Sequence, residues 1–265
     1  KSVDKQIHIF NKNDFSYLTS IGNFGEGPEE ITVMGCLAID EAHHQLYVSD
    51  HAKQKIFSYD MDSVMVDSLY KPQVKTAMNE TLFPSEYQYI NDTLSIAVLI
   101  KPTSTSTFNQ FLGRWNMNTG EMIPMKYTHP DIQKKRITFA ASEKAGIYVE
   151  CYTRHDLMTI CSLDGELLYN IYGPDWDGGN GNKLQSFGTV MIGNDKIFVS
   201  YCGEDYARDS FPTKILVFDL EGNYFKTLET GYKISDCCYD SFNNRIILSL
   251  NDVVQFAYLD IDGII

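Results

Sequence analysis

Short stretches of alternating apolar and polar residues recur along the chain, and each one ends in the same way. The alternation runs into a large apolar residue, which is followed by Asp or Asn and then by a turn. Period-two alternation is typical of a strand with one buried face, and Asp and Asn favour turns because their side chains hydrogen-bond to the backbone. Six copies are present: QIHIFNKND (6–14), KIFSYDMDS (55–63), FLGRWNMNTG (111–120), MTICSLDGE (158–166), KILVFDLEGN (214–223) and QFAYLDIDG (255–263).

A second set of strands lies between these copies and is rich in β-branched and aromatic residues. Each is preceded by a short turn and another strand, and each copy of the first pattern except the last is followed by a fourth strand. The second set comprises LYVSD (46–50), LSIAVL (94–99), IYVECY (147–152), IFVSYC (197–202) and IILSL (246–250). The fourth strands are predicted at 15–22, 64–70, 121–127, 166–173 and 223–231.

The spacing of these repeats predicts the fold class. The large apolar residues that end the first pattern are 49, 56, 48, 55 and 41 residues apart, which is the range of four-stranded propeller blades. We therefore expect an all-β protein, a six-bladed beta-propeller of four-stranded antiparallel blades, as a single domain over residues 1–265. No amphipathic helix of ten residues is predicted. The expected blade segments are 1–21, 35–70, 86–127, 137–172, 186–230 and 233–265.

Counting strands shows that the first and last blades are incomplete in this chain. The first blade lacks its first two strands and the last blade lacks its fourth, because only five copies of each of these strands are found beside six copies of the third. Five blades with a surplus N-terminal strand are the alternative. The segment GNFGEGPEEI (22–31) is interpreted as the crossing between the first two blades, since its glycines permit positive φ and Pro28 fixes a bend.

This crossing carries a family resemblance. GNFGEGPEEI, followed by LAIDEAHHQLYVSD (37–50) and KIFSYDMD (55–62), resembles the NHL-type repeat, with departures at Glu29, at Ile31 and at the EAHHQ turn. These departures are similar to the variant in TolB-like six-bladed propellers of Gram-negative anaerobes. The resemblance implies an exported protein, periplasmic or anchored in the outer membrane as a lipoprotein through a lipid upstream of Lys1. It implies no reaction, because propellers host many functions on one framework.

Composition narrows the classes of partner. With 35 acidic and 22 basic residues the net charge is −13, so we expect no nucleic-acid partner. The longest apolar run, Leu94 to Ile100 with one Ser inside it, is too short to predict a membrane span. The chain begins at Lys1 without a signal-peptide pattern, which we interpret as a processed or trimmed N-terminus.

The six cysteines are interpreted mainly as buried free thiols. There is no CxxC pair and no His placed to complete a zinc site. Cys237 and Cys238 should point to opposite faces of one strand, and are therefore poorly placed to bind one metal. An exported protein could also form disulfides, whose pairing the sequence does not give.

Long connections locate a candidate ligand surface. The turns between second and third strands and the connections between blades are expected to be long, at 70–86, 101–110, 127–137, 173–186 and 203–213, and to share one face. Binding residues concentrate on such loops. Polar residues predicted there are Asp50, His51, Lys101, Arg154, His155, Glu204, Asp205 and Arg208, and Trp176 and Tyr206 are placed to stack on a sugar or aromatic ring.

We favour a non-enzymatic propeller that binds a peptide, glycan or protein partner on this face. The alternative is a metal-assisted hydrolase or lyase at the central channel, in which Asp, Asn and Glu would hold calcium as in lactonases. His51 and His155 are suited to proton transfer, but no third partner is evident and no G-x-S-x-G nucleophile motif is present. The Asp or Asn that follows each first-pattern strand is interpreted as a turn residue rather than as a metal ligand.

Overall fold

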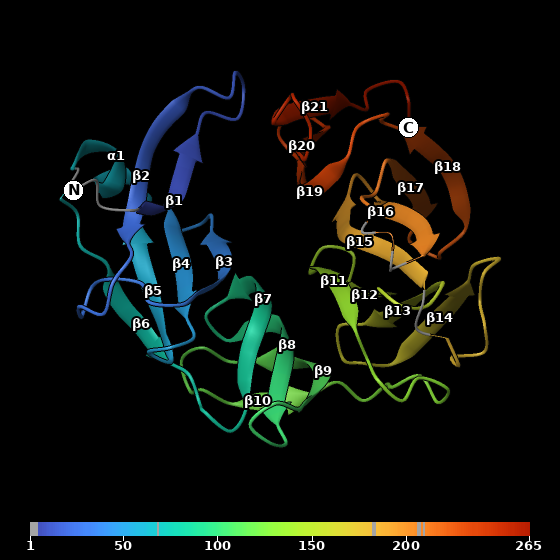
Figure 1. Cartoon of the computed structure of the whole chain (residues 1–265), viewed down its shortest axis with the longest axis horizontal. Coiled ribbons are helices and arrows are strands. Elements are labelled where there is room, and N and C mark those ends of the chain that lie inside the picture. Colours follow the sequence, from blue (N-terminus) through green and yellow to red (C-terminus); the bar gives the residue numbers. More distant parts are fainter. Residues whose placement is uncertain (1–4, 68, 182–183, 206–207, 209) are drawn as a thin grey trace. The chain divides into compact units, whose positions relative to one another are not determined.

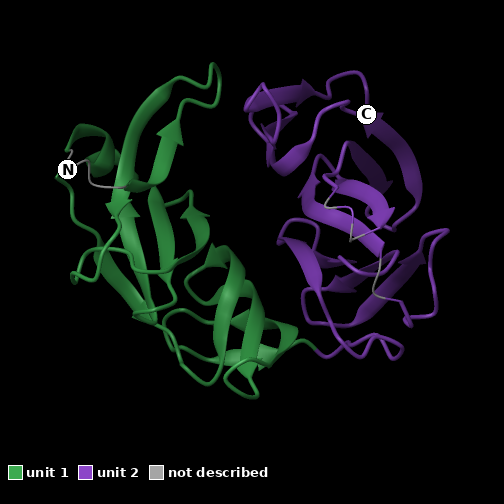
Figure 2. Cartoon of the chain, viewed as in Figure 1, with its two compact units in different colours: residues 1–125 green, residues 126–265 purple. Residues whose placement is uncertain are grey.

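The computed structural model describes residues 5–67, 69–181, 184–205, 208 and 210–265. They fall into two compact units, Lys1–Met125 and Lys126–Ile265 (Figure 2). Both units consist of antiparallel sheets in which strands that follow one another in sequence pair with one another (Figure 1). This hairpin connectivity is what short turns between alternating segments require.

Unit 1 contains one two-stranded and two four-stranded sheets among its described residues. Its only helix there is a short one, α1 (Met61–Val66). The strands are β1 (Lys5–Phe10), β2 (Tyr17–Asn23), β3 (Met34–Asp40), β4 (Gln45–Asp50), β5 (Lys55–Asp60), β6 (Gln73–Ala77), β7 (Phe83–Asn91), β8 (Leu94–Pro102), β9 (Phe108–Trp115) and β10 (Met122–Pro124).

Unit 2 contains two four-stranded sheets and a three-stranded sheet among its described residues. The strands are β11 (Ile137–Ser142), β12 (Ile147–Tyr152), β13 (Leu157–Ser162), β14 (Leu167–Tyr172), β15 (Leu184–Gly193), β16 (Lys196–Asp205), β17 (Lys214–Asp219), β18 (Tyr224–Glu229), β19 (Ile234–Asp240), β20 (Arg245–Leu250) and β21 (Phe256–Asp260). The sheet sizes agree with the predicted strand count: two strands at the start, four in each complete repeat and three at the end.

The sequence prediction was wrong for the fourth strand of the second repeat. Residues 61–66 form α1, and the fourth strand is β6, which starts at Gln73. Asp60 begins the helix because its carboxylate accepts a hydrogen bond of 2.7 Å from the backbone N–H of Ser63. The connection predicted at 70–86 therefore contains a strand, and the one predicted at 101–110 shrinks to 103–107.

The turn role predicted for Asp and Asn after the third strands is confirmed. Asn116 accepts hydrogen bonds from the backbone N–H groups of Asn118 and Thr119. Asp219 does the same for Glu221 and Asn223. These side chains replace the hydrogen-bond partners that the backbone loses where a strand ends.

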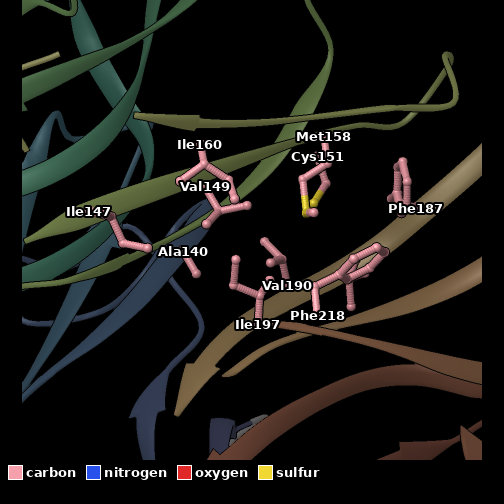
Figure 3. Close-up of a cluster of buried hydrophobic side chains, with 11 residues drawn as sticks. Ala140, Ile147, Val149, Cys151, Met158, Ile160, Phe187, Val190, Ile197 and Phe218 are labelled. Atoms are coloured by element: carbon pink, nitrogen blue, oxygen red, sulfur yellow. The ribbon is translucent and has the colours of Figure 1, made fainter. Parts of the chain in front are cut away.

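Apolar side chains fill the space between neighbouring sheets of each unit. In unit 2, Val149 and Ile160 of one sheet lie against Val190 and Ile197 of the next (Figure 3), and none of the four is more than 5% exposed. Burial of such a side chain contributes about 1.5–3 kcal/mol. First strands of adjacent sheets are neighbours within each unit, β3 with β7 in unit 1 and β11 with β15 in unit 2, so these pairs of sheets support one another.

The described residues include no helix that is long and apolar enough to cross a membrane. All six cysteines are free thiols, of which Cys151, Cys161 and Cys237 are buried. Cys238 is exposed beside the buried Cys237, as predicted from the alternation of a strand.

Candidate functional site

Three connections converge at one end of the sheet formed by β11 to β14. The register pairs Ile137 with Tyr152 and Leu157 with Tyr172. Three segments therefore meet at this end of the sheet. They are the segment that leads into β11, the β12–β13 turn and the segment that leaves β14. Residues 126–136, 153–156 and 173–181 form this group, which we call the fourth-repeat loops. It includes the predicted site residues Arg154, His155 and Trp176.

Aromatic rings hold the fourth-repeat loops together. Trp176 lies against Tyr172, His129 and His155, with ring centroids 5.0, 5.5 and 6.2 Å apart respectively. The Nδ1 atom of His129 accepts a hydrogen bond from the backbone N–H of Asp131, so the proton on its Nε2 atom is free to donate to the Tyr172 hydroxyl at 3.1 Å. Burial lowers the pKa of His129, which agrees with a neutral ring. Trp176 therefore has a packing role that sequence reasoning did not foresee.

The glycines of the loop after Trp176 allow close backbone contacts. Gly179 has a φ of +78°, and a Cβ there would lie 2.5 Å from the carbonyl oxygen of Asp131. A Cβ on Gly181 would overlap the carboxylate of Asp177. That carboxylate accepts a hydrogen bond of 3.0 Å from the N–H of Gly179. The glycine-rich sequence is thus required for the loop to fold over Asp177 and against residue 131.

Asp177 also faces His155. The Nδ1 atom of His155 lies 3.6 Å from the Asp177 carboxylate and has no hydrogen-bond partner among the described residues. The His155 side chain is buried, whereas Asp177 is partly exposed. A slightly closer approach, or one intervening water, would join the two groups.

A pocket of about 530 Å³ opens beside His155. We call it the Arg154 pocket. Its walls carry three cationic side chains, one carboxylate, two amides and two glycines in addition to His155. The lining residues are Asp131, Gln133, Lys134, Arg136, Arg154, His155, Gly179, Asn180 and Gly181. In a protein of net charge −13, this is a local concentration of positive charge, which attracts anions.

A buried ion pair lies beneath these loops. The Lys135 ammonium donates to the Glu150 carboxylate at 2.5 Å, and their side chains are 7% and 1% exposed. The Tyr152 hydroxyl donates to the other carboxylate oxygen of Glu150 at 3.3 Å. The sequence analysis missed both charged residues. A Glu inside the apolar strand IYVECY was the signal that a buried cation had to be nearby.

Asp50 and His51 occupy the corresponding turn of the second repeat in unit 1, where both face inward. Asp50 is 0% exposed, and its carboxylate accepts hydrogen bonds from the backbone N–H groups of Thr32 and Val33 at 2.8 and 3.2 Å. The two residues that directly follow the predicted crossing at 22–31 are thereby fastened to the end of β4. The ring of His51 packs against Gly35, where a Cβ would lie 2.4 Å from Nε2, and burial lowers its pKa.

The other predicted site residues do not line the Arg154 pocket. Lys101 lies near the exposed end of β8 in unit 1. Glu204 and Asp205 end β16, and Arg208 donates to Glu204 at 3.0 Å on the surface. Tyr206 lies outside the described residues.

The calcium-dependent alternative stays a prediction. Within the described ranges, no three or more His, Cys, Asp or Glu side chains are grouped so that they could hold a metal ion. Elemental analysis after dialysis tests this alternative. We expect less than 0.1 calcium or zinc per chain, roughly the background for a protein without a site that retains metal. One ion per chain would contradict this expectation and favour the enzyme.

Comparison with known proteins supports the fold class. A family model described as a 6-bladed beta-propeller matches residues 1–114, all within unit 1. No curated protein matches the sequence. Among solved structures, the chain is similar to a member of the DUF4221 family from Bacteroides vulgatus, with 10% identity and a TM-score of 0.63. The match covers 98% of this chain and 87% of that one.

Two further structures share this likeness. The beta-propeller domain of Cps50 (Swd1) from Myceliophteria thermophila has 9% identity and a TM-score of 0.59, over 96% of this chain and 88% of that one. The extracellular domain of a protein assigned as a one component system in B. thetaiotaomicron has 14% identity and a TM-score of 0.55, over 88% of this chain. The match covers only 28% of that protein's chain. At such identities the likeness shows fold alone, and the chain is an all-β propeller protein with four-stranded antiparallel blades.

Proposed function

We propose that this protein is a binding propeller that takes an acidic saccharide in the Arg154 pocket. The observation that carries the proposal is the grouping of Lys134, Arg136 and Arg154 around one concavity of an otherwise acidic protein. A guanidinium presents parallel N–H donors that match the two oxygens of a carboxylate, and such charge-assisted bonds are stronger than neutral ones.

The remaining lining favours a sugar over an apolar ligand. Gln133 and Asn180 offer amide donors and acceptors, which suit the hydroxyl groups of a saccharide. The volume of about 530 Å³ is within the range of small-ligand sites. The ring contacts of Trp176 with His155 support one wall of the pocket, so the site is held in shape before a ligand arrives.

An exported location accords with this function. The same fold occurs in the extracellular domain from B. thetaiotaomicron. We therefore propose that the protein works outside the cytoplasm, as an anchored or free binding protein. Under this proposal the pocket recognises the sugar and performs no reaction on it.

Calorimetric titration with galacturonic acid and its oligomers tests the proposal, with galactose as the neutral match. Replacing Arg154 with Gln should weaken binding of the acid at least about tenfold, because a charge-assisted hydrogen bond contributes roughly 1.5–3 kcal/mol. Binding should also weaken as salt is added.

Arg208→Gln is the matched control, since it removes the same charge from an exposed residue that pairs with Glu204 outside the pocket. We expect its affinity to equal that of the wild type. Equal binding of galactose and galacturonic acid, or an equal effect of the two substitutions, would exclude the Arg154 pocket as an acid-sugar site.

A further inference from the structure

Unit 1 has a pocket of its own. Its described lining residues include more apolar side chains than those of the Arg154 pocket. It measures about 460 Å³ and lies among the end of β2, the crossing segment and the chain between α1 and β6. We call it the Tyr59 pocket. Its apolar wall includes Ile21, Tyr59, Val64, Leu69 and Tyr70.

The wall continues the apolar core between the first two sheets. Ile21, Tyr59 and Val64 belong to the buried cluster that joins β1 and β2 to the sheet of β3 to β6. The ring centroids of Tyr59 and Tyr70 are 6.3 Å apart, so two aromatic rings lie along the same wall. Such a surface favours an apolar ligand with a ring that can pack against Tyr70.

Two polar atoms in this wall have no partner. The hydroxyl of Tyr59 and the Oδ1 atom of Asn23 are both buried, and neither makes a hydrogen bond within the described part of the chain. Tyr59 is 1% exposed. Buried polar groups are almost always paired, and an unpaired one in the wall of a cavity indicates that a ligand or a water completes it.

Charged residues also line the pocket. Lys71 pairs with Glu29 at 2.8 Å on the surface, and Glu30 accepts a hydrogen bond from the N–H of Gly27. These carboxylates are thus already engaged by neighbours. The buried unpaired atoms of the pocket are neutral, so its ligand need carry no charge.

We propose that the Tyr59 pocket binds an aromatic ring compound that carries a hydroxyl group. A hydroxyl both donates and accepts, so the hydroxyl of such a ligand can accept a hydrogen bond from the Tyr59 hydroxyl. The ring of the ligand then lies against Tyr70, which is only half-buried. This site is separate from the proposed acid-sugar function, because the two pockets share no lining residue.

The Tyr59 hydroxyl is suited to donate. Burial raises its pKa to about 12, so it stays protonated at neutral pH. The backbone around it is held close: a Cβ on Gly22 would lie 2.7 Å from Ile31 Cδ1 and 3.6 Å from the Tyr59 hydroxyl oxygen. The crossing segment thereby fixes the position of the pocket's polar end.

The experiment compares 2-naphthol with naphthalene by ligand-observed NMR titration of the full chain. We expect 2-naphthol to bind about tenfold more tightly than naphthalene, since only 2-naphthol can accept a hydrogen bond from the Tyr59 hydroxyl. Tyr59→Phe should remove this preference, with little loss of affinity for naphthalene. The melting temperature of Tyr59→Phe should not fall, because the substitution removes an unpaired buried hydroxyl.

Tyr148→Phe is the matched control. Tyr148 is a fully buried tyrosine of unit 2 whose hydroxyl lies beside the Cys161 thiol, and it does not line the Tyr59 pocket. We expect this variant to keep the preference for 2-naphthol. The proposal is overturned if the wild-type protein binds neither compound, if it binds both equally, or if Tyr59→Phe keeps the preference. These outcomes leave the sugar titration at the Arg154 pocket unaffected, so the two proposals fail separately.

Discussion

Replacing Lys135 with Met is expected to lower the free energy of unfolding by about 3–5 kcal/mol. The ammonium of Lys135 is the cation that contacts the carboxylate of Glu150, and that carboxylate lies in the interior of unit 2. Without it, the hydrogen bond from the Tyr152 hydroxyl is what remains to the Glu150 carboxylate among the described residues. A buried carboxylate that has lost its cation carries the full cost of its desolvation. Urea unfolding at pH 7 measures the loss.

The double variant Lys135→Met, Glu150→Gln separates charge from packing. A neutral Gln side chain still offers an oxygen to the Tyr152 hydroxyl and leaves no charge unpaired. We therefore expect most of the lost stability to return, because buried ion pairs are often replaceable by neutral side chains of similar volume. Equal losses in the single and double variants would show that Lys135 acts through its aliphatic stem instead of its charge.

The effect should extend to the candidate site. Lys135 lies in the same loop segment as two lining residues of the Arg154 pocket, Lys134 and Arg136. Lys135 is buried while Lys134 is exposed, so the pair with Glu150 anchors a segment whose neighbouring cations face the pocket. The guanidinium of Arg136 also donates to the carbonyl of residue 135 at 2.7 Å. A binding defect that persists in the double variant, where the stability has returned, would reflect this anchoring.

The strands were predictable from sequence because their signals are local. Alternation, a large apolar residue and a turn residue all lie within about ten positions, and the repeat multiplies the signal six times. The fourth strand of the second repeat shows the limit. VMVDSLY is more apolar than QVKTA, the actual strand β6, and the capping role of Asp60 depends on one hydrogen bond to Ser63.

The candidate site was predicted only in part, since its residues depend on contacts between distant segments. Arg154 and His155 were found because they follow a second strand directly. Lys135 was missed because the run Gln-Lys-Lys-Arg (133–136) has the composition of a solvated surface. Its buried partner Glu150 is 15 residues away, and nothing in the local pattern of either segment states that they meet.

Asp50 was predicted as a ligand-binding residue, but its carboxylate is buried and binds backbone groups of a distant segment. An acidic residue at the end of a strand is typical of a ligand-binding loop, and its inward role is set by backbone N–H groups 17 and 18 residues earlier in the chain. Its carboxylate also accepts hydrogen bonds from the N–H groups of Ala52 and Lys53. The Lys53 ammonium lies 3.4 Å away and donates to the carbonyl of Glu30 in the crossing segment. This network makes Asp50 the residue that joins the crossing to β4.

Replacing Asp50 with Asn is accordingly expected to cost about 3 kcal/mol of unfolding free energy at pH 7. The new NH₂ group would face backbone donors, and the Lys53 ammonium would lose its counter-charge. Asp14→Asn is the matched control. Asp14 also accepts a hydrogen bond from a backbone N–H, that of Ser16, but it lies on the surface. The loss of unfolding free energy in Asp14→Asn should therefore be far smaller.

The pH dependence of the Asp50→Asn loss follows from the direction of the pKa shift. Burial pushes the pKa of Asp50 upward, but the hydrogen bonds from Thr32, Val33 and Lys53 and the charge of Lys53 outweigh it and hold the pKa below its ordinary value of 3.8. A carboxyl with a depressed pKa stabilises the folded state above its unfolded pKa, and that contribution is lost as the pH falls through the folded pKa. The difference between wild type and Asp50→Asn should therefore be constant from about pH 7 to pH 5 and shrink below about pH 4. Urea midpoints across this range measure it, and a difference that stays the same down to about pH 3 would show that shape rather than charge sets the effect.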